Sequence, residues 1–249
     1  MDDLVTLRML IVAAAGPERD ALREAAALSS LPLDVAEAET GGKAAAMADG
    51  KSFDIVLLDG NLPEADRIRV AKACRECSPP AFVIGLAGAG QTAEPKWADA
   101  QGRRPANPDD AKKLIEGCVR ARMPLRVLVV DDSSTMRGIV GKILGATRFR
   151  VELTEAEDGV AACDAVKKSP QDIVFLDYNM PGLDGVATLA ELKRERPNVR
   201  VVIMTSMQDA ALAERARAAG ADGFLKKPFY PADIGDVLYR LCGLRPVTA

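Results

Sequence analysis

The stretch that decides the fold is Val174-Phe-Leu-Asp-Tyr-Asn-Met-Pro-Gly-Leu-Asp-Gly185. A short apolar run leads into one carboxylate, Asp177, and a turn with proline and glycine follows before a helix start. An apolar run of this kind with β-branched members is typical of a buried strand in a parallel sheet. Asp177 then stands at the carboxyl end of that strand, the edge of an open α/β sheet where ligands bind. This carboxylate is therefore a candidate site residue and not a core residue.

Three further apolar runs each end in a polar group. They are Leu125–Val130 before Asp131 and Asp132, Val201–Met204 before Thr205, and Gly223–Leu225 before Lys226 and Lys227. Because the carboxyl ends of parallel strands meet at one edge of a sheet, we expect these groups to gather beside Asp177. Acids, a hydroxyl and a lysine at one edge indicate a site with chemistry and argue against coincidence.

The first half of the chain repeats the second half at an offset of 118 residues. Leu7–Val12 matches Leu125–Val130, and Asp54–Asp59 matches Asp172–Asp177. An unbroken offset over a segment this long indicates duplicated architecture, in a unit far longer than a solenoid repeat. We therefore expect two domains, 1–122 and 123–249, joined directly at Met123-Pro124 without a flexible linker.

Each copy alternates apolar strands with amphipathic helices, which predicts an α/β fold with a five-stranded parallel sheet and helices on both faces. In the second copy, the expected strands lie near 125–130, 149–154, 172–177, 199–205 and 222–226. The expected helices lie near 133–145, 159–168, 184–196, 209–219 and 231–242. In the first copy, glycines and a proline in segment 88–97 argue against a full fourth helix.

This combination of an acid pair, a central acid, a threonine and a lysine at successive strand ends resembles that of the receiver domain of two-component response regulators. The resemblance covers Leu125–Leu241, and both Asp131-Asp-Ser-Ser-Thr-Met-Arg137 and Ala156-Glu-Asp-Gly159 look like chemotaxis-type, or CheY-like, members. It implies two tandem (βα)5 flavodoxin-like receiver domains. It also implies a response regulator of a two-component phosphorelay, with a sensor histidine kinase or a phosphotransfer protein as the partner.

The resemblance implies a role for each site residue of the second copy. Asp177 is the phosphoacceptor, assisted by Lys227 and Thr205. Thr205 is also the switch hydroxyl, followed by Phe224 as the aromatic switch residue, although simple packing explains Phe224 equally well. Mg²⁺ is the expected cofactor because it prefers oxygen ligands and binds few carboxylates together with phosphate. Its expected ligands are Asp132, Asp177, the backbone carbonyl of Asn179 and, through a water, Asp131.

The same positions in the first copy have lost most of these groups. The replacements are Ala13 and Ala14 for the acid pair, Ala87 for Thr205, and Arg104, at an offset of 123, for Lys227. The central acid remains as Asp59, and capping of its turn without chemistry is the alternative interpretation. Arg104 can pair permanently with Asp59 because a guanidinium stays charged. The first copy therefore resembles a degenerate receiver, or pseudo-receiver, and we expect a fixed protein-interaction module.

Composition limits the possible partners. A net charge of −3 over 249 residues carries no basic footprint for nucleic acid. No apolar run approaches the ~20 residues of a membrane span, so we expect a cytoplasmic protein with no nucleic-acid or membrane partner. The chain contains no histidine and cannot carry a phosphohistidine, so the phosphoryl donor is a partner or a small molecule.

The five cysteines are scattered, and an odd number argues against a disulfide framework. Cys74-Arg-Glu-Cys77 has metal or redox spacing. The alternative is two thiols one turn apart on a helix.

No output domain is recognisable after Leu241, so we expect output through a protein surface, about Asp209–Cys242, and a homodimer favoured by phosphorylation. Beyond assisting its own phosphorylation and dephosphorylation, the protein is not expected to be an enzyme. A phosphorelay intermediate or phosphate sink is the competing interpretation. An aspartyl-nucleophile phosphatase would need an acid two residues after Asp177, where Asn179 stands.

Overall fold

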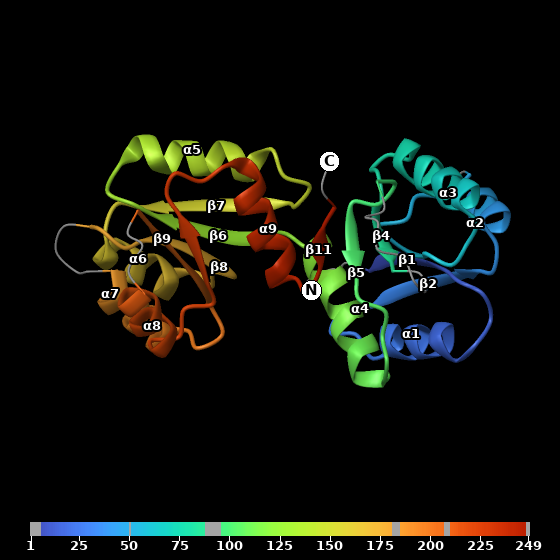
Figure 1. The fold of residues 1–249 in the computed structure, drawn as a ribbon, viewed down its shortest axis with the longest axis horizontal. Coiled ribbons are helices and arrows are strands. Elements are labelled where there is room, and N and C mark those ends of the chain that lie inside the picture. Colours follow the sequence, from blue (N-terminus) through green and yellow to red (C-terminus); the bar gives the residue numbers. More distant parts are fainter. Residues whose placement is uncertain (1–5, 50, 88–95, 181–184, 207–209, 248–249) are drawn as a thin grey trace. The chain divides into compact units, whose positions relative to one another are not determined.

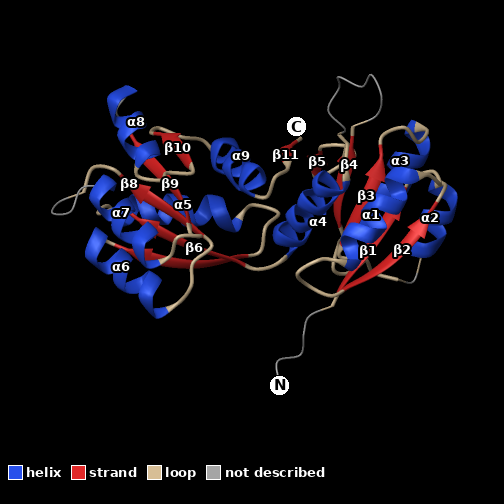
Figure 2. Cartoon of the chain, turned by 90° about the horizontal axis from the view of Figure 1, so that it is seen from below, coloured by secondary structure: helices blue, strands red, loops and turns tan. Residues whose placement is uncertain are grey.

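The computed structural model describes residues 6–49, 51–87, 96–180, 185–206 and 210–247. The turn at 181–184, and most of the segment for which no fourth helix is expected, lie outside these ranges. The chain divides into two compact units, Met1–Arg122 with Tyr239–Ala249, and Met123–Leu238. Both units are α/β structures in which helices cover a largely parallel sheet, as the strands and helices of Figure 2 show.

The first unit contains a five-stranded parallel sheet with helices on both faces. Its parallel strands are β1 (Leu7–Val12), β2 (Leu33–Ala38), β3 (Ile55–Asp59), β4 (Phe82–Leu86) and β5 (Ala100–Gly102). Its helices are α1 (Pro17–Ala27), α2 (Gly41–Ala48), α3 (Glu64–Glu76) and α4 (Pro108–Arg122). Helices α1 and α4 pack together on one face, and α2 and α3 pack together on the other (Figure 1).

The central strands β3 and β4 of the first unit are buried throughout and almost wholly apolar because both faces of the sheet are covered there. Leu10, Val12, Val56 and Val83 are fully buried in one core cluster beneath α2 and α3. Burial of each such side chain contributes about 1.5–3 kcal/mol. The first unit therefore has an apolar core of its own, as its sequence predicts.

A sixth strand, β11 (Arg245–Pro246), extends the sheet of the first unit. It pairs antiparallel with β5, so the sheet order is β11-β5-β4-β3-β1-β2. Leu244, next to β11, is 3% exposed. The expected range 123–249 for the second domain differs from the structure in this last segment. The physical reason is that an otherwise open strand edge gains a backbone partner there and apolar side chains are buried.

The segment before β11 also packs within the first unit. The rings of Tyr239 and Phe82 stack with centroids 6.4 Å apart. A Cβ atom added to Gly117 of α4 would lie 2.2 Å from the carbonyl oxygen of Cys242, which is itself buried. Glycine at 117 therefore permits a close approach of two backbone segments that any side chain would prevent.

The second unit contains a five-stranded parallel sheet of order β10-β9-β8-β6-β7. Its strands are β6 (Leu125–Val130), β7 (Val151–Ala156), β8 (Ile173–Asp177), β9 (Arg200–Thr205) and β10 (Gly223–Lys226). Its helices are α5 (Ser134–Gly145), α6 (Gly159–Lys168), α7 (Gly185–Glu195), α8 (Ala210–Ala218) and α9 (Pro231–Leu241), of which the last three residues, from Tyr239, belong to the first unit. Helices α5 and α9 lie on one face of the sheet, and α6, α7 and α8 lie on the other (Figure 1).

The second strand of this unit begins two residues later than its sequence pattern suggests. β7 pairs with β6 in a register that sets Leu125 opposite Val151 and Val130 opposite Ala156. The apolar Phe149, counted into the strand by its hydrophobicity, is buried just before it. Phe149 is therefore apolar because it is buried, and it is not part of the β6–β7 pairing.

Local caps fix where the helices near the sheet edge begin. The Ser133 hydroxyl accepts a hydrogen bond from the Met136 amide at 3.3 Å, and the Asp158 carboxylate accepts one from the Ala161 amide at 2.8 Å. At the start of α7, a Cβ atom on Gly185 would lie 2.8 Å from the carbonyl oxygen of Asp177. These features bring the starts of α5, α6 and α7 close to the carboxyl ends of β6, β7 and β8.

Candidate functional site

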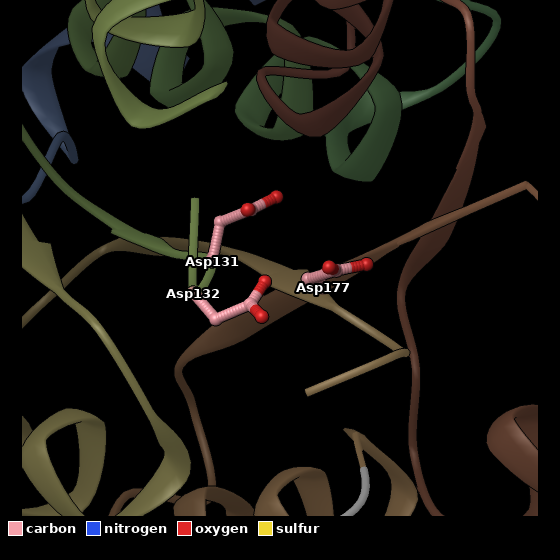
Figure 3. Close-up of side chains that lie close together, drawn as sticks. All are labelled: Asp131, Asp132 and Asp177. Carbon is pink, nitrogen blue, oxygen red and sulfur yellow. The ribbon is translucent and has the colours of Figure 1, made fainter. Parts of the chain in front are cut away.

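Three carboxylates meet at the point where the strand order of the second sheet reverses. β6 lies next to β8, while β7 lies on its other side. Asp131 and Asp132 directly follow β6, and Asp177 ends β8. Each of the three offers an oxygen within 4.8 Å of the others (Figure 3). The reversal point of a doubly wound sheet is where such folds bind ligands, so the predicted residues occupy the expected edge.

Lys227 joins two of these acids. Its ammonium nitrogen lies 2.8 Å from Asp131 Oδ2 and 3.0 Å from Asp177 Oδ1. Burial lowers the pKa of Lys227, but its hydrogen bonds and charge attraction to both carboxylates outweigh burial and raise the pKa above its ordinary value. The lysine is therefore held as a cation between the two acids.

The surroundings of Asp177 disfavour the ionised form of its carboxyl group. Asp177 is 5% exposed and Asp131 is 1% exposed. Burial raises the pKa of Asp177, Lys227 opposes this rise, and the nearby charge of Asp131 adds to it. One ammonium does not fully offset the cluster, so the site favours a further cation.

The backbone around the acids is fixed by hydrogen bonds. The Ser133 amide donates to Asp131 Oδ1 at 2.9 Å, and the Asn179 amide donates to Asp177 Oδ1 at 3.4 Å. Arg137 donates to the carbonyl oxygen of Asp131 at 2.8 Å and to Glu155 at 2.9 Å. The interpretation of the sequence missed Arg137, although Arg19 and Glu37 repeat the Arg137 and Glu155 pair at the offset of 118.

The two switch candidates lie on β9 and β10. Thr205 is buried at the end of β9, and its carbonyl oxygen accepts the Lys227 amide at 2.8 Å, which ties the threonine to the lysine segment. Phe224 is half-buried against the core of the second unit, with the Arg217 guanidinium 5.3 Å from its ring centroid. Lys226 is exposed and Lys227 is not, as expected from the position of Lys227 before proline.

The corresponding edge of the first unit is built differently. Ala13 and Ala14 follow β1 and offer no side-chain ligand, and Asp59 ends β3. Arg104 forms ion pairs with Asp59 and with Glu18 of α1. The predicted pairing of Arg104 with Asp59 is therefore confirmed. Glu18 was missed, because nothing in the duplicated pattern marks an acid where the second copy has Met136.

Cys74 and Cys77 form no disulfide. Cys74 is buried, and burial raises the pKa of its thiol to about 11. The Cys77 thiol lies 3.4 Å from the carbonyl oxygen of Ala73, one turn earlier on α3. Among the described residues, neither cysteine belongs to a group that could hold a metal ion.

Comparison with known proteins supports the interpretation of the second unit. A family model, the response regulator receiver domain, matches residues 127–239. The chemotaxis protein CheY of Bacillus subtilis is 36% identical over 107 residues, which span 43% of this chain and 88% of that protein. The chain belongs to the response regulator receiver family. CheY of Thermotoga maritima is 32% identical over 119 residues, spanning 48% of this chain and 98% of that protein.

One solved structure extends the likeness of this receiver protein to both units. A probable two-component system response regulator/GGDEF domain protein covers 94% of this chain and 97% of its own, with a TM-score of 0.56 and 22% identity. At that identity the likeness shows the fold alone, which is flavodoxin-like in both units. Within the described part of the receiver protein, every helix is too short or too polar to cross a membrane.

Proposed function

We propose that this protein is a response regulator in which Asp177 accepts a phosphoryl group from a histidine kinase or a phosphotransfer protein. The observation that carries the proposal is the Lys227 ammonium, which lies within 3.0 Å of two carboxylates in a cluster of three. A lysine so placed can neutralise charge that develops on a transferring phosphoryl group.

The reaction follows from the chemistry of a carboxylate nucleophile. An oxygen of Asp177 attacks phosphorus, and the bond from phosphorus to the donor imidazole nitrogen breaks. The electron pair of that bond stays on the imidazole, and an acyl phosphate forms on Asp177. The half-buried Lys227 reaches both the acceptor oxygen and the neighbouring Asp131, which keeps the acceptor oriented.

The donor set fits a divalent cation. Mg²⁺ prefers carboxylate, carbonyl and phosphate oxygens, and the three clustered acids supply carboxylate oxygens within 4.8 Å of one another. Asp132 and Asp177 would hold the ion directly, with the Asn179 carbonyl, and Asp131 would hold it through a water. When bound, the ion would offset the negative charge of the acids and of the incoming phosphoryl group.

The response is a local change at the ends of β9 and β10. Phosphoryl oxygens on Asp177 offer new acceptors to the Thr205 hydroxyl, and Phe224 follows by changing rotamer. Output then runs through a protein surface that includes α8, β10 and α9, and phosphorylation favours a homodimer. The first unit acts as a degenerate receiver that binds partners without being phosphorylated.

A phosphorelay intermediate or phosphate sink uses the same site, and differs only in where the phosphoryl group goes next. An aspartyl-nucleophile phosphatase fits the geometry poorly. The position two residues after Asp177 is Asn179, which cannot act as its general acid.

The test is labelling of the purified chain by a radiolabelled small phosphodonor in the presence of Mg²⁺. The wild-type chain should take up a label that both acid and base release, as expected of an acyl phosphate, and Asp177→Asn should take up none. Asp59→Asn is the matched control from the first unit and should label like wild type. Label that persists in Asp177→Asn would remove Asp177 as the acceptor.

A further inference from the structure

Among the described residues, Arg104 makes three polar contacts at the sheet edge of the first unit. Its two terminal nitrogens form ion pairs with Glu18 and Asp59, and its Nε donates to the carbonyl oxygen of Ala87 at 2.9 Å. These partners come from α1, the end of β3 and the residue just after β4. A planar guanidinium is suited to this arrangement because its donors point in fixed, diverging directions.

The charge at this edge differs from the charge at the second site in one respect. Among the described residues, the second site holds three carboxylates and one ammonium, which leaves two negative charges for a divalent cation to offset. Within the same described part of the chain, the guanidinium at the first site contacts two carboxylates, Glu18 and Asp59. The residue matching Glu18 in the second unit is Met136, so the acid and the arginine both depart from the second-unit pattern.

We propose that Arg104 is the resident cation of the first unit and closes its site to divalent metal ions. In this role one guanidinium supplies the positive charge that Lys227 and a metal ion would supply together in the second unit. Through the Ala87 carbonyl it also holds the end of β4, the position that matches Thr205. The inference rests on the proposed function only in taking the first unit as a site that is not phosphorylated.

Two further observations support a closed site. Ala13 is buried and, like Ala14, offers no metal ligand. The pKa of Arg104 is raised, since burial lowers it but contacts with Asp59 and Glu18 outweigh burial. The internal cation therefore stays charged at every pH at which the chain folds, so the site stays closed.

The test uses Mn²⁺ as the probe, because it takes carboxylate oxygens as Mg²⁺ does and can be counted by electron paramagnetic resonance. The second site is first silenced by Asp132→Asn with Asp177→Asn in the full chain. This background should bind no Mn²⁺ at millimolar concentrations. Adding Arg104→Met should create one Mn²⁺ site, with at least a tenfold rise in affinity over the background. Adding Glu18→Gln as well should abolish the new site.

The fluorescence of Trp97, the only tryptophan of the chain and a residue of the first unit, reports whether each variant is folded. If the Arg104→Met variant does not fold, Arg104→Gln replaces it, because glutamine keeps hydrogen-bond donors at this position. Arg104→Gln should also create one Mn²⁺ site. A folded Arg104 variant without a Mn²⁺ site would overturn the proposal. So would Mn²⁺ binding by the background chain that Asp59→Asn removes. Neither result affects labelling of Asp177, so failure here is distinct from failure of the proposed function.

Discussion

The two units keep the same structural carboxylates but not the same site. Asp54 accepts the Arg8 amide at 2.9 Å, and at the offset of 118 Asp172 accepts the Arg126 amide at 2.9 Å. These acids stand at the amino ends of β3 and β8, opposite the edge that carries the site.

A second pair of acids behaves in the same way. Asp99 accepts the Val83 amide at 2.9 Å and pairs with Arg75. Asp222 accepts the Val201 amide at 2.8 Å and pairs with Lys193. A buried backbone donor without an acceptor costs about 1–3 kcal/mol in either unit, so these acids stabilise both units.

The site acids differ because the backbone groups that they accept belong to the turns after the strands: Asp131 accepts the Ser133 amide and Asp177 accepts the Asn179 amide. Ala13 and Ala14 replace Asp131 and Asp132 without leaving a backbone group of β1 unpaired, since the Ala13 amide still donates to the Ala38 carbonyl. Comparison of the units thus separates acids that hold strands in both units from the acid pair that only the second unit has at its sheet edge.

The largest expected effect that tests this difference is on phosphorylation. Lys227→Ala removes the ammonium that contacts Asp131 and Asp177, and should slow labelling by about 10²–10³-fold. Rapid-quench labelling with a small phosphodonor measures the rate. Lys226→Ala changes the exposed neighbour and should leave the rate unchanged. If both variants lost the same labelling rate, the contacts of Lys227 with the two carboxylates would not matter, and only the positive charge near the site would.

The next effect tests whether the first unit depends on its extra strand. Leu244→Ala removes a side chain that is 3% exposed, and should lower the free energy of unfolding of this unit by about 2–3 kcal/mol. Urea unfolding followed by Trp97 fluorescence reports the first unit. Leu28→Ala, at a leucine that is 73% exposed, is the control and should change little. An unchanged midpoint for Leu244→Ala would mean that β11 is dispensable.

The smallest effect concerns the ionisation of Asp177 in protein kept free of metal by a chelator. Because the folded-state pKa of Asp177 lies above its unfolded value, the ionised carboxylate lowers stability once the pH exceeds the folded pKa. Asp177→Asn should therefore raise the melting temperature of the second unit at pH 7 by about 2–4 °C.

This gain should fade as the pH falls through the raised pKa towards the ordinary aspartate value, and calorimetry at several pH values can follow it. Asp59→Asn should have the opposite sign at pH 7, because it removes an ion-paired partner of Arg104. A stabilised Asp59→Asn chain would mean that the two central acids sit in similar environments.

The second site could be predicted almost completely from the sequence. Asp131, Asp132, Asp177, Thr205 and Lys227 each stand at or just after the end of an apolar run, and strand direction alone places them at one edge. The replacements at Ala13, Ala14 and Ala87 follow from the offset of 118, and the pairing of Arg104 with Asp59 follows from the place of Arg104 before proline at an offset of 123. Strand periodicity carries this information because it is local and repeats.

Features that depend on distant segments could not be predicted. Glu18 reaches Arg104 only because α1 begins beside the sheet edge, and sequence spacing does not fix that distance. The strand at Arg245–Pro246 has two residues and no apolar alternation, so no periodicity reveals it. The expected strand begins near Phe149, whereas register with β6 decides that β7 begins at Val151.

The edge strand β11 has a consequence for how the protein is made. Since β11 follows the whole of the second unit in the chain, the second unit is, in topological terms, an insertion within the first. Domains generally fold as they leave the ribosome, with the N-terminal one first. Here the first unit to be synthesised is the last to be completed, because the edge of β5 stays open until β11 has emerged. During translation, that open edge is available for pairing with another chain.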